Sequence, residues 1–317
     1  MQKNLAAQTI VILGTGGTIA GTAAQSADNV GYRAGTLSVQ SLIDAVPGLA
    51  GYTLEAEQVA QLDSKDMDHA TWQRLAQAVD QHLQRAEVQG VVITHGTDTL
   101  EETAYFLQRV LAPEKPVLLT AAMRPATALM ADGPQNLLDA VAVLGQLAAA
   151  GHAGVAAVVA GRIHAAEQVQ KAHSYRVDAF RSRDESLIGL VEEGQLRQLG
   201  SWPIAQQALG LAHIARPAST WPRVQIVLNH AGADGTVVAA LMAQGVDGLV
   251  VAGTGNGTLA TGLEQALLEA QQQGVRVLRC SRCESGPVIG GNAALPSAGA
   301  LSAVKARVEL LLQLLLA

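Results

Sequence analysis

The sequence alternates short apolar runs with longer segments of helical periodicity, and this alternation restricts the chain to an α/β fold. In the first part of the chain we predict strands over Thr9–Gly14, Val91–Thr94, Val117–Ala122 and Gly154–Ala160. The predicted helices are Trp72–Arg85, Leu100–Leu111 and Gln135–Ala148. Strands that are connected through helices run parallel, so we expect a largely parallel sheet with helices on both faces.

The alternation weakens between Glu192 and Pro222, where Gly, Gln and Pro are scattered without a sustained period. We interpret residues 192–222 as a linker between a large catalytic α/β domain, 1–191, and a smaller parallel α/β domain, 223–317. In the smaller domain we predict strands over Val224–Asn229, Gly248–Gly253 and Val275–Cys280. The predicted helices are Thr236–Gln244, Leu259–Gln273 and Leu301–Leu316. A sheet of three or four parallel strands fits this number of elements.

Composition excludes several classes of partner. The 317 residues carry a net charge of −6, and only 3% of them are aromatic, which argues against nucleic-acid binding. We find no apolar run long enough to span a membrane, and no apolar core of a signal peptide in Met1–Gln8. We therefore expect no membrane partner and a cytoplasmic location, or a periplasmic one if a signal peptide has been removed.

The chain has two cysteines, Cys280 and Cys283, which rules out a disulfide scaffold. One such pair cannot supply the four ligands of a structural zinc site, and no clear helix follows it as in a thioredoxin-type motif. We interpret the pair as two small residues at the end of a strand.

Two predicted strand-to-helix loops are dense in reactive side chains, and ligands bind at this edge of open α/β sheets. The first is Gly14–Thr18, which lacks the third glycine of a dinucleotide fingerprint and the Lys-Ser/Thr ending of a P-loop. The second is Thr94–Thr99, with the sequence THGTDT. From the residues alone, each loop has a structural alternative: Thr18 and Asp98 could be helix N-caps, and Thr99 with Glu102 matches a capping box.

The same loops resemble signatures of a known family. TGGTIAG, Thr15–Gly21, resembles the first signature of bacterial-type L-asparaginases and glutaminase-asparaginases, and THGTDTLEETA, Thr94–Ala104, resembles the second. Shorter matches occur at Ser64–Met67, Ala122–Pro125, Asp132–Pro134, Asn136–Leu137, Gly255–Gly257 and Lys305–Arg307. The similarity runs from about Thr9 to Leu312 and is closer to the type II pattern, with a shortened segment after Arg282.

The resemblance implies hydrolysis of the side-chain amide of asparagine through a covalent acyl-enzyme, without metal or cofactor. Thr18 matches the family's nucleophilic threonine, and Thr97, Asp98 and Lys171 match a Thr–Lys–Asp set in the same site. Such a set requires a lysine that loses its proton readily, which burial can promote. The implied oxyanion donors are the Thr97 N–H and backbone groups at Ala122.

The resemblance also assigns a lid and substrate contacts. Tyr32, in the long loop 20–36, matches the lid tyrosine that activates the first threonine. Asp98 is expected to bind the substrate's ammonium group, as well as orienting the Thr–Lys–Asp set. The remaining implied substrate contacts are Gly17, Ser64, Lys65 and Asn256.

Two departures leave the choice of substrate open. Lys65 stands where periplasmic members usually have glutamine, and Glu284 does not align securely with a glutamate that reaches the neighbouring subunit. We predict an L-asparagine amidohydrolase, with a glutaminase-asparaginase of low discrimination as the alternative and a non-catalytic amino-acid-binding relative as a weaker one. A homotetramer, built as a dimer of dimers with sites at subunit interfaces, is implied.

Overall fold

The computed structural model of the protein describes residues 8–202, 207–290 and 294–317. Its contacts divide the chain into two compact units, the first ending at Ala212 and the second beginning at His213. The predicted linker, 192–222, contains the strand β10, Gln195–Gln198, which pairs antiparallel with β9, Gly189–Glu192. The domain boundaries drawn from the sequence stay a prediction.

The first unit is built on an eight-stranded sheet in the order β10-β9-β6-β5-β4-β3-β1-β2. Five neighbouring strands are parallel: β1 Thr9–Gly16, β2 Leu54–Leu62, β3 Val88–Thr94, β4 Pro116–Thr120 and β5 Gly154–Val159. β6, Arg162–Ala165, pairs antiparallel with β5 and continues the sheet toward β9 and β10. The predicted mainly parallel α/β sheet is confirmed.

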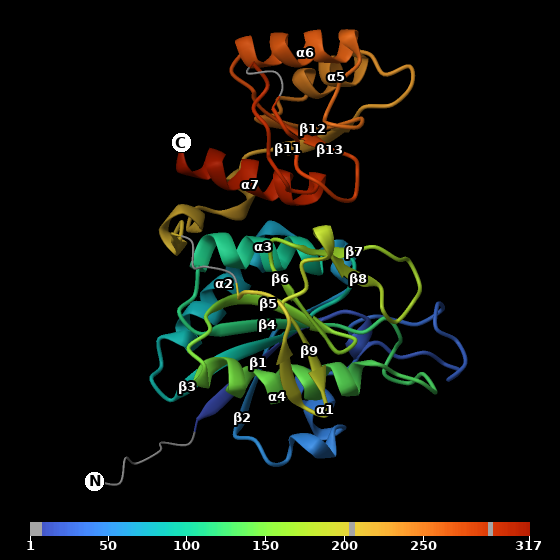
Figure 1. Ribbon diagram of the computed structural model, residues 1–317, viewed down its shortest axis with the longest axis vertical. Coiled ribbons are helices and arrows are strands. Elements are labelled where there is room, and N and C mark those ends of the chain that lie inside the picture. Colours follow the sequence, from blue (N-terminus) through green and yellow to red (C-terminus); the bar gives the residue numbers. More distant parts are fainter. Residues whose placement is uncertain (1–7, 203–206, 291–293) are drawn as a thin grey trace. The chain divides into compact units, whose positions relative to one another are not determined.

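Four helices cover the two faces of this sheet. They are α1 Val39–Asp44, α2 His69–Leu83, α3 Leu100–Leu111 and α4 Gly133–Ala149. Figure 1 shows α2 and α3 on one face and α1 with α4 on the other, in agreement with the packing of α2 against α3. Helices on both faces were predicted from the alternation and are confirmed.

The connection β4–α4–β5 has the opposite hand to its neighbours. The step from β3 to β4 runs in the same direction along the sheet as the step from β4 to β5, but α3 and α4 cross opposite faces. The step from β2 to β3 also runs in this direction, and α2 lies on the same face as α3, so β2–α2–β3 and β3–α3–β4 share one hand. Because about 98% of such connections are right-handed, we assign the right hand to these two, and β4–α4–β5 is the left-handed exception. The first turn of α4 lies against Ile19, since a Cβ at Gly133 would be 2.8 Å from the Ile19 Cγ1.

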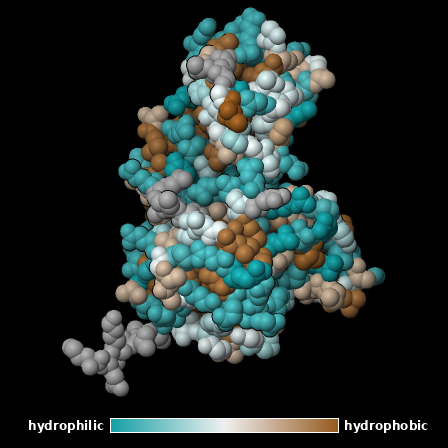
Figure 2. All heavy atoms as spheres, in the orientation of Figure 1, coloured by the Kyte–Doolittle hydropathy of each residue, from teal (hydrophilic) through white to brown (hydrophobic). Residues whose placement is uncertain are grey.

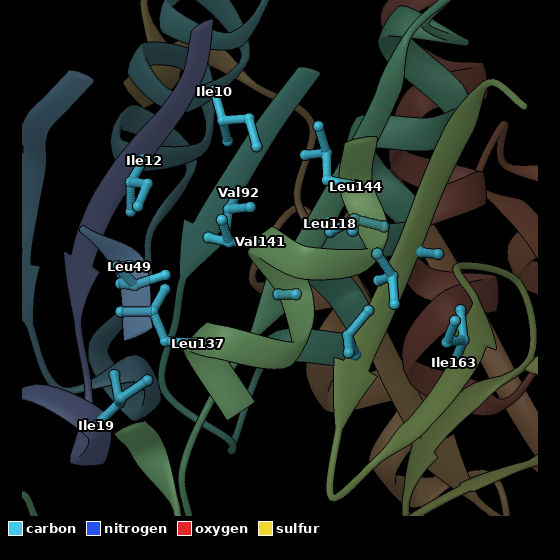
Figure 3. Close-up of a cluster of buried hydrophobic side chains, with 14 of the residues drawn as sticks. Ile10, Ile12, Ile19, Leu49, Val92, Leu118, Leu137, Val141, Leu144 and Ile163 are labelled. Atoms are coloured by element: carbon cyan, nitrogen blue, oxygen red, sulfur yellow. The ribbon is translucent and has the colours of Figure 1, made fainter. Parts of the chain in front are cut away.

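The main core lies between the sheet and the α1–α4 layer (Figure 3). Ile10 and Ile12 of β1 and Val92 of β3 point toward Leu137 and Val141 of α4 in the close-up, and all five are buried. Burying a side chain of this kind contributes roughly 1.5–3 kcal/mol, so this layer fixes the strands whose ends carry the two loops.

A short hairpin lies beside α3. It consists of β7, Val169–Lys171, and β8, Phe180–Ser182, paired antiparallel. β7 contacts α3, and the hairpin thereby presents Lys171 to the segment that precedes that helix.

The second unit has a three-stranded parallel sheet, β11-β12-β13. Its strands are β11 Val224–Leu228, β12 Gly248–Gly253 and β13 Arg276–Ser281. Its helices are α5 Thr236–Ala243, α6 Thr261–Gln272 and α7 Ala303–Leu316. α5 and α6 share a buried cluster with Leu249 and Val251, whereas Gly248 faces Leu310 and Leu314 of α7 on the other side of the sheet. The predicted small parallel sheet is confirmed.

The visible surface mixes polar and apolar residues (Figure 2). Among the larger apolar side chains, Val30, Leu129 and Met130 are at least 72% exposed. Scattered apolar exposure of this kind is ordinary for folded proteins. Within the residues that the structure describes, no helix is both long and apolar enough to cross a bilayer.

Candidate active site

The two reactive loops touch through glycine. Gly17 follows β1 with φ 80°, a conformation that residues with a Cβ rarely adopt, and a Cβ at this position would collide with the Gly96 backbone. Gly96 follows β3 and is enclosed equally tightly, because a Cβ there would collide with the Ser64 hydroxyl. The neighbouring carboxyl ends of β1 and β3 therefore bring the loops of Thr18 and Thr97 into direct contact.

The hydroxyl of Thr18 is paired with that of Tyr32. The Thr18 Oγ1 lies 2.6 Å from the Tyr32 hydroxyl oxygen, and Thr18 is buried. Thr18 begins a short 3-10 helix, Thr18–Ala20, whose N-cap is Gly17, so the hydroxyl is not used for capping. The structural alternative for Thr18 is therefore wrong, and its side chain is available for chemistry.

Backbone pairing holds the loop that carries Tyr32 in place. Thr22 and Arg33 form an antiparallel bridge, and the Thr22 and Thr36 hydroxyls lie 2.9 Å apart. The same loop is joined to residues 126–129, since the Ala126 N–H donates to the Gly21 carbonyl and the Leu129 N–H to the Ser26 carbonyl. These contacts hold the loop in the position in which Tyr32 reaches Thr18.

On the second loop, one ammonium group connects a hydroxyl and a carboxylate. The Lys171 Nζ donates to the Thr97 Oγ1 over 2.8 Å and to the Asp98 Oδ1 over 2.6 Å. Its side chain is 18% exposed and that of Asp98 51% exposed. The Asp98 Oδ2 has no partner among the described residues, so it remains available to a cationic ligand.

The segment before α3 is held by Ser64 rather than by a capping box. The Thr99 side chain makes no capping bond and instead donates to the Ser64 carbonyl over 2.8 Å. The Asp98 N–H donates to the Ser64 Oγ over 3.1 Å, and Ser64 is buried. The capping alternatives for Thr99 and Asp98 are therefore wrong. The Ser64 hydroxyl accepts one bond and keeps its own hydrogen for another partner.

Two backbone N–H groups beside these side chains lack acceptors. Thr97 and Ala122 are buried, and in the part of the chain that the structure describes neither N–H has a hydrogen-bond partner. The turn at Ala122 is fixed by Asp132, whose carboxylate accepts from the Met123 and Arg124 N–H groups over 2.9 and 3.0 Å. Burial raises the pKa of Asp132, against the effect of these two bonds.

Asn136 also supports this turn. Its Nδ2 donates to the Ala121 carbonyl over 2.8 Å, and its Oδ1 accepts from the Ala160 N–H over 2.9 Å. Sequence reasoning gave neither Asp132 nor Asn136 a role, although both lie in the DGPQN segment where the resemblance was noted.

Two of the predicted substrate contacts are engaged elsewhere. The Lys65 Nζ lies 2.7 Å from the Asp63 Oδ2 and 3.2 Å from the Asp66 Oδ2, and its side chain is 61% exposed. Both carboxylates raise the pKa of Lys65. Asn256 belongs to the second unit, where its side-chain amide pairs with the backbone N–H and carbonyl of Ile289 over 2.8 and 2.7 Å.

His95, between β3 and Thr97, is a residue that sequence reasoning left without a role. It is fully buried, and its Nδ1 lies 2.7 Å from the Gly96 carbonyl oxygen. Desolvation lowers the pKa of His95 to about 4, so the imidazole is neutral over the range in which most enzymes work. Its position inside the THGTDT motif was the signal available in the sequence.

The described residues include neither a metal-binding cluster nor a disulfide. Within residues 8–202, 207–290 and 294–317, no three His, Cys, Asp or Glu side chains stand close enough together to hold a metal ion. Cys280 is buried on β13, Cys283 is exposed, and both are thiols rather than a disulfide. Glu284 lies in the exposed turn that follows.

Comparison with known proteins identifies the family. The family model described as "Asparaginase, N-terminal" matches residues 9–202, and "Glutaminase/Asparaginase C-terminal domain" matches residues 223–317. The chain belongs to the asparaginase family. Together the two matches of this asparaginase chain include all the predicted site residues.

Individual relatives agree with this assignment. The chain is 36% identical over 317 residues to L-asparaginase 2 of Escherichia coli K12, covering 98% of this chain and 90% of that protein. It is 36% identical over 291 residues to the glutaminase-asparaginase of Pseudomonas fluorescens, covering 90% and 79%. Among solved structures, a probable cytoplasmic L-asparaginase from Campylobacter jejuni matches with a TM-score of 0.89 and 37% identity, covering 96% and 94%.

Proposed function

We propose that this asparaginase-family chain hydrolyses the side-chain amide of L-asparagine to L-aspartate and ammonia, with Thr18 as the nucleophile. The proposal rests on two hydroxyl groups that lie on adjoining loops, each of which is hydrogen-bonded to a polar side chain. Thr18 is paired with Tyr32, and Thr97 is paired with Lys171 and, through it, with Asp98. A hydroxyl is a weak nucleophile until a neighbouring group accepts its proton, and Tyr32 is positioned to accept that of Thr18. The Lys171 ammonium donates to the Thr97 oxygen, which leaves the Thr97 hydrogen free to be donated to a reacting oxygen.

In the first half-reaction the Thr18 Oγ1 bonds to the amide carbon. Its proton passes to the Tyr32 oxygen as the tyrosine gives its own to the amide nitrogen, and the carbon–nitrogen bond breaks to release ammonia. The negative charge on the carbonyl oxygen of the tetrahedral intermediate is stabilised by the N–H groups of Thr97 and Ala122, which have no other acceptor among the described residues. The product is an aspartyl ester of Thr18.

In the second half-reaction water bonds to the ester carbon and the bond to the Thr18 oxygen breaks. One water proton returns to the Thr18 oxygen, and L-aspartate leaves. The Thr97 hydroxyl accepts from Lys171 and can donate its own hydrogen to a reacting oxygen. The lid loop, joined to residues 126–129, limits access of water until the ester has formed.

Substrate recognition is proposed for groups that surround these hydroxyls. The Asp98 Oδ2 binds the α-ammonium group, and the Ser64 hydroxyl donates to the α-carboxylate, since each atom has bonding capacity to spare. Gly17 permits close approach of the backbone to the ligand. Lys65 stays a proposed carboxylate contact, and Asn256 a proposed contact across a subunit interface.

A glutaminase-asparaginase of low discrimination is the second candidate, favoured by the similarity to the Pseudomonas fluorescens protein of that name. Glutamine is one methylene longer than asparagine, and a pocket gains only about 1–3 kcal/mol of discrimination from such a difference. The deciding experiment is kcat/KM on both amides. A ratio above about 100 in favour of asparagine supports the first candidate, and a ratio near one supports the second.

We also propose a homotetramer and a cytoplasmic location. The family resemblance implies the former, and the similarity to the Campylobacter jejuni protein favours the latter. Light scattering tests the assembly: a mass of about four chains is expected, and a fully active monomer would contradict it. Release of the activity only on rupture of the inner membrane is expected of a cytoplasmic enzyme.

A further inference from the structure

His95 makes a hydrogen bond that the proposed reaction does not use directly. Its backbone N–H donates to the Thr120 carbonyl over 2.9 Å, which continues the pairing of β3 with β4. Its ring Nδ1 lies 2.7 Å from the Gly96 carbonyl oxygen. Since a carbonyl can only accept, Nδ1 carries the hydrogen and donates it.

A purely structural role does not explain why this position is a histidine, because the other ring nitrogen makes no hydrogen bond in the part of the chain that the structure describes. This nitrogen, Nε2, is buried. Buried polar atoms without partners are costly, and an apolar side chain would avoid this cost at the same position. The Nδ1–H is therefore the feature of this ring that the site requires.

The Gly96 carbonyl determines the direction of the Thr97 N–H. The described residues contain no cis peptide bond, and in a trans peptide the carbonyl and the following N–H point in opposite directions. With the Gly96 carbonyl directed at the His95 ring, the Thr97 N–H is directed away from it. Glycine restricts its own backbone little, so a bond from outside is needed to hold this peptide plane.

We propose that His95 is a positioning residue, whose Nδ1–H holds the Gly96 carbonyl so that the Thr97 N–H points at the oxyanion of the tetrahedral intermediate. The inference rests on the proposed amide hydrolysis and deepens it. His95 does not touch the substrate. Its contribution appears only where charge develops on the carbonyl oxygen, that is, in the transition state.

Three substitutions separate the Nδ1–H from the bulk of the ring. His95→Asn places an amide nitrogen at about the position of Nδ1 and retains a donor to the Gly96 carbonyl. His95→Gln moves the amide to about the position of Nε2, and His95→Leu removes both nitrogens. The Asn and Gln variants both carry a side-chain amide and differ in where it lies. Comparing these two variants therefore tests the role of the Nδ1–H even if the Leu variant does not fold.

The expected result is a loss of kcat without a loss of ground-state binding. We expect His95→Gln and His95→Leu to lower kcat about 10- to 100-fold, a part of the effect of removing an oxyanion donor altogether. KM for asparagine and Kd for aspartate should stay within about twofold of wild type. His95→Asn should retain kcat within about threefold.

Leu144→Ala provides the control for destabilisation alone. Leu144 is buried on α4 and lies near Gly90, at the end of β3 opposite to His95. It should lower Tm while kcat stays unchanged. Provided that the wild-type enzyme is active, a wild-type kcat in His95→Gln would overturn the positioning role. A loss of aspartate affinity in His95→Gln as large as its loss of kcat would also overturn it. The same holds if Leu144→Ala lowers kcat as much as His95→Gln does. An inactive wild type on every amide overturns both proposals.

Discussion

The Tyr32 hydroxyl lies 2.6 Å from the Thr18 Oγ1, although 14 positions separate the two residues in the sequence. The bridge between Thr22 and Arg33 folds the intervening loop back on itself and produces this contact. The phenol is thus within proton-transfer distance of the proposed nucleophile, so the loop that we propose as a lid also contributes a side chain to the reaction site.

Tyr32→Phe tests the phenol without changing the ring. We expect kcat on asparagine to fall about 100- to 1,000-fold, because the proton relay loses its middle member. The ring still packs against Gly21, where an added Cβ would lie 2.9 Å from the Tyr32 Cδ2, so Tm should change by less than about 2 °C. Steady-state kinetics with a thermal melt checks both. Wild-type turnover in Tyr32→Phe would remove the tyrosine from the relay.

Lys171→Met tests the ammonium group that joins Thr97 to Asp98. We expect kcat to fall at least about 100-fold, since the Thr97 oxygen loses the cation that donates to it and that directs the Thr97 hydrogen toward the reacting oxygen. Lys115→Met is a matched control, because the Lys115 Nζ donates only to the Arg85 and Val88 carbonyls at the far end of the sheet. The control should lose stability and keep kcat; equal kcat losses in both variants would refute a specific role for Lys171.

Ser64→Ala and Lys65→Ala test recognition of the substrate carboxylate. The buried Ser64 hydroxyl has a hydrogen to donate, so we expect its removal to raise KM for asparagine about tenfold. Lys65→Ala should raise KM less, by about two- to fivefold, because the Lys65 Nζ is already paired with the Asp63 and Asp66 carboxylates. A wild-type KM in Lys65→Ala would remove Lys65 from the substrate contacts, and a wild-type KM in Ser64→Ala would remove Ser64.

His95 predicts a pH dependence of stability. Its pKa is lowered from 6.5 to about 4 by burial, so between these values the unfolded chain binds a proton that the folded chain does not. The corresponding stability is present above pH 6.5 and is lost as the pH falls toward 4, by up to about 3 kcal/mol.

Urea unfolding between pH 7 and 4.5 measures this effect. His95→Asn removes the titrating group, so its unfolding free energy should fall less steeply with pH than that of the wild type. Identical slopes for the two proteins would show that His95 does not titrate as its burial requires.

The parallel core of the fold could be predicted from the sequence, whereas its edges could not. β3 and β12 are buried along nearly their whole length and read as continuous apolar runs. β2 and β10 are the two edge strands and are half-buried or exposed, and β9 is only four residues long, so none of the three forms a long apolar run. The sequence patterns of these strands do not distinguish them from loops. The hand of β4–α4–β5 is a tertiary property that no local pattern encodes.

The candidate site also contains residues that local sequence patterns could predict and residues that they could not. Thr18 and Thr97 lie in motifs at the ends of apolar runs, where a ligand site is expected in this class of fold. Lys171 lies 73 residues after Asp98 and is delivered by the β7–β8 hairpin, so only the family resemblance selected it. His95 was visible in the motif, but its bond to the next residue's carbonyl depends on the backbone turn at Gly96.

The most direct test of the account is ammonia release from L-asparagine by the purified wild type and by Thr18→Ala. The account predicts equimolar ammonia and aspartate from the wild type. In Thr18→Ala it predicts a kcat lower by at least about 1,000-fold, because no acyl-enzyme can form. Turnover by Thr18→Ala at the wild-type rate, or no ammonia from the wild type on either asparagine or glutamine, would contradict it.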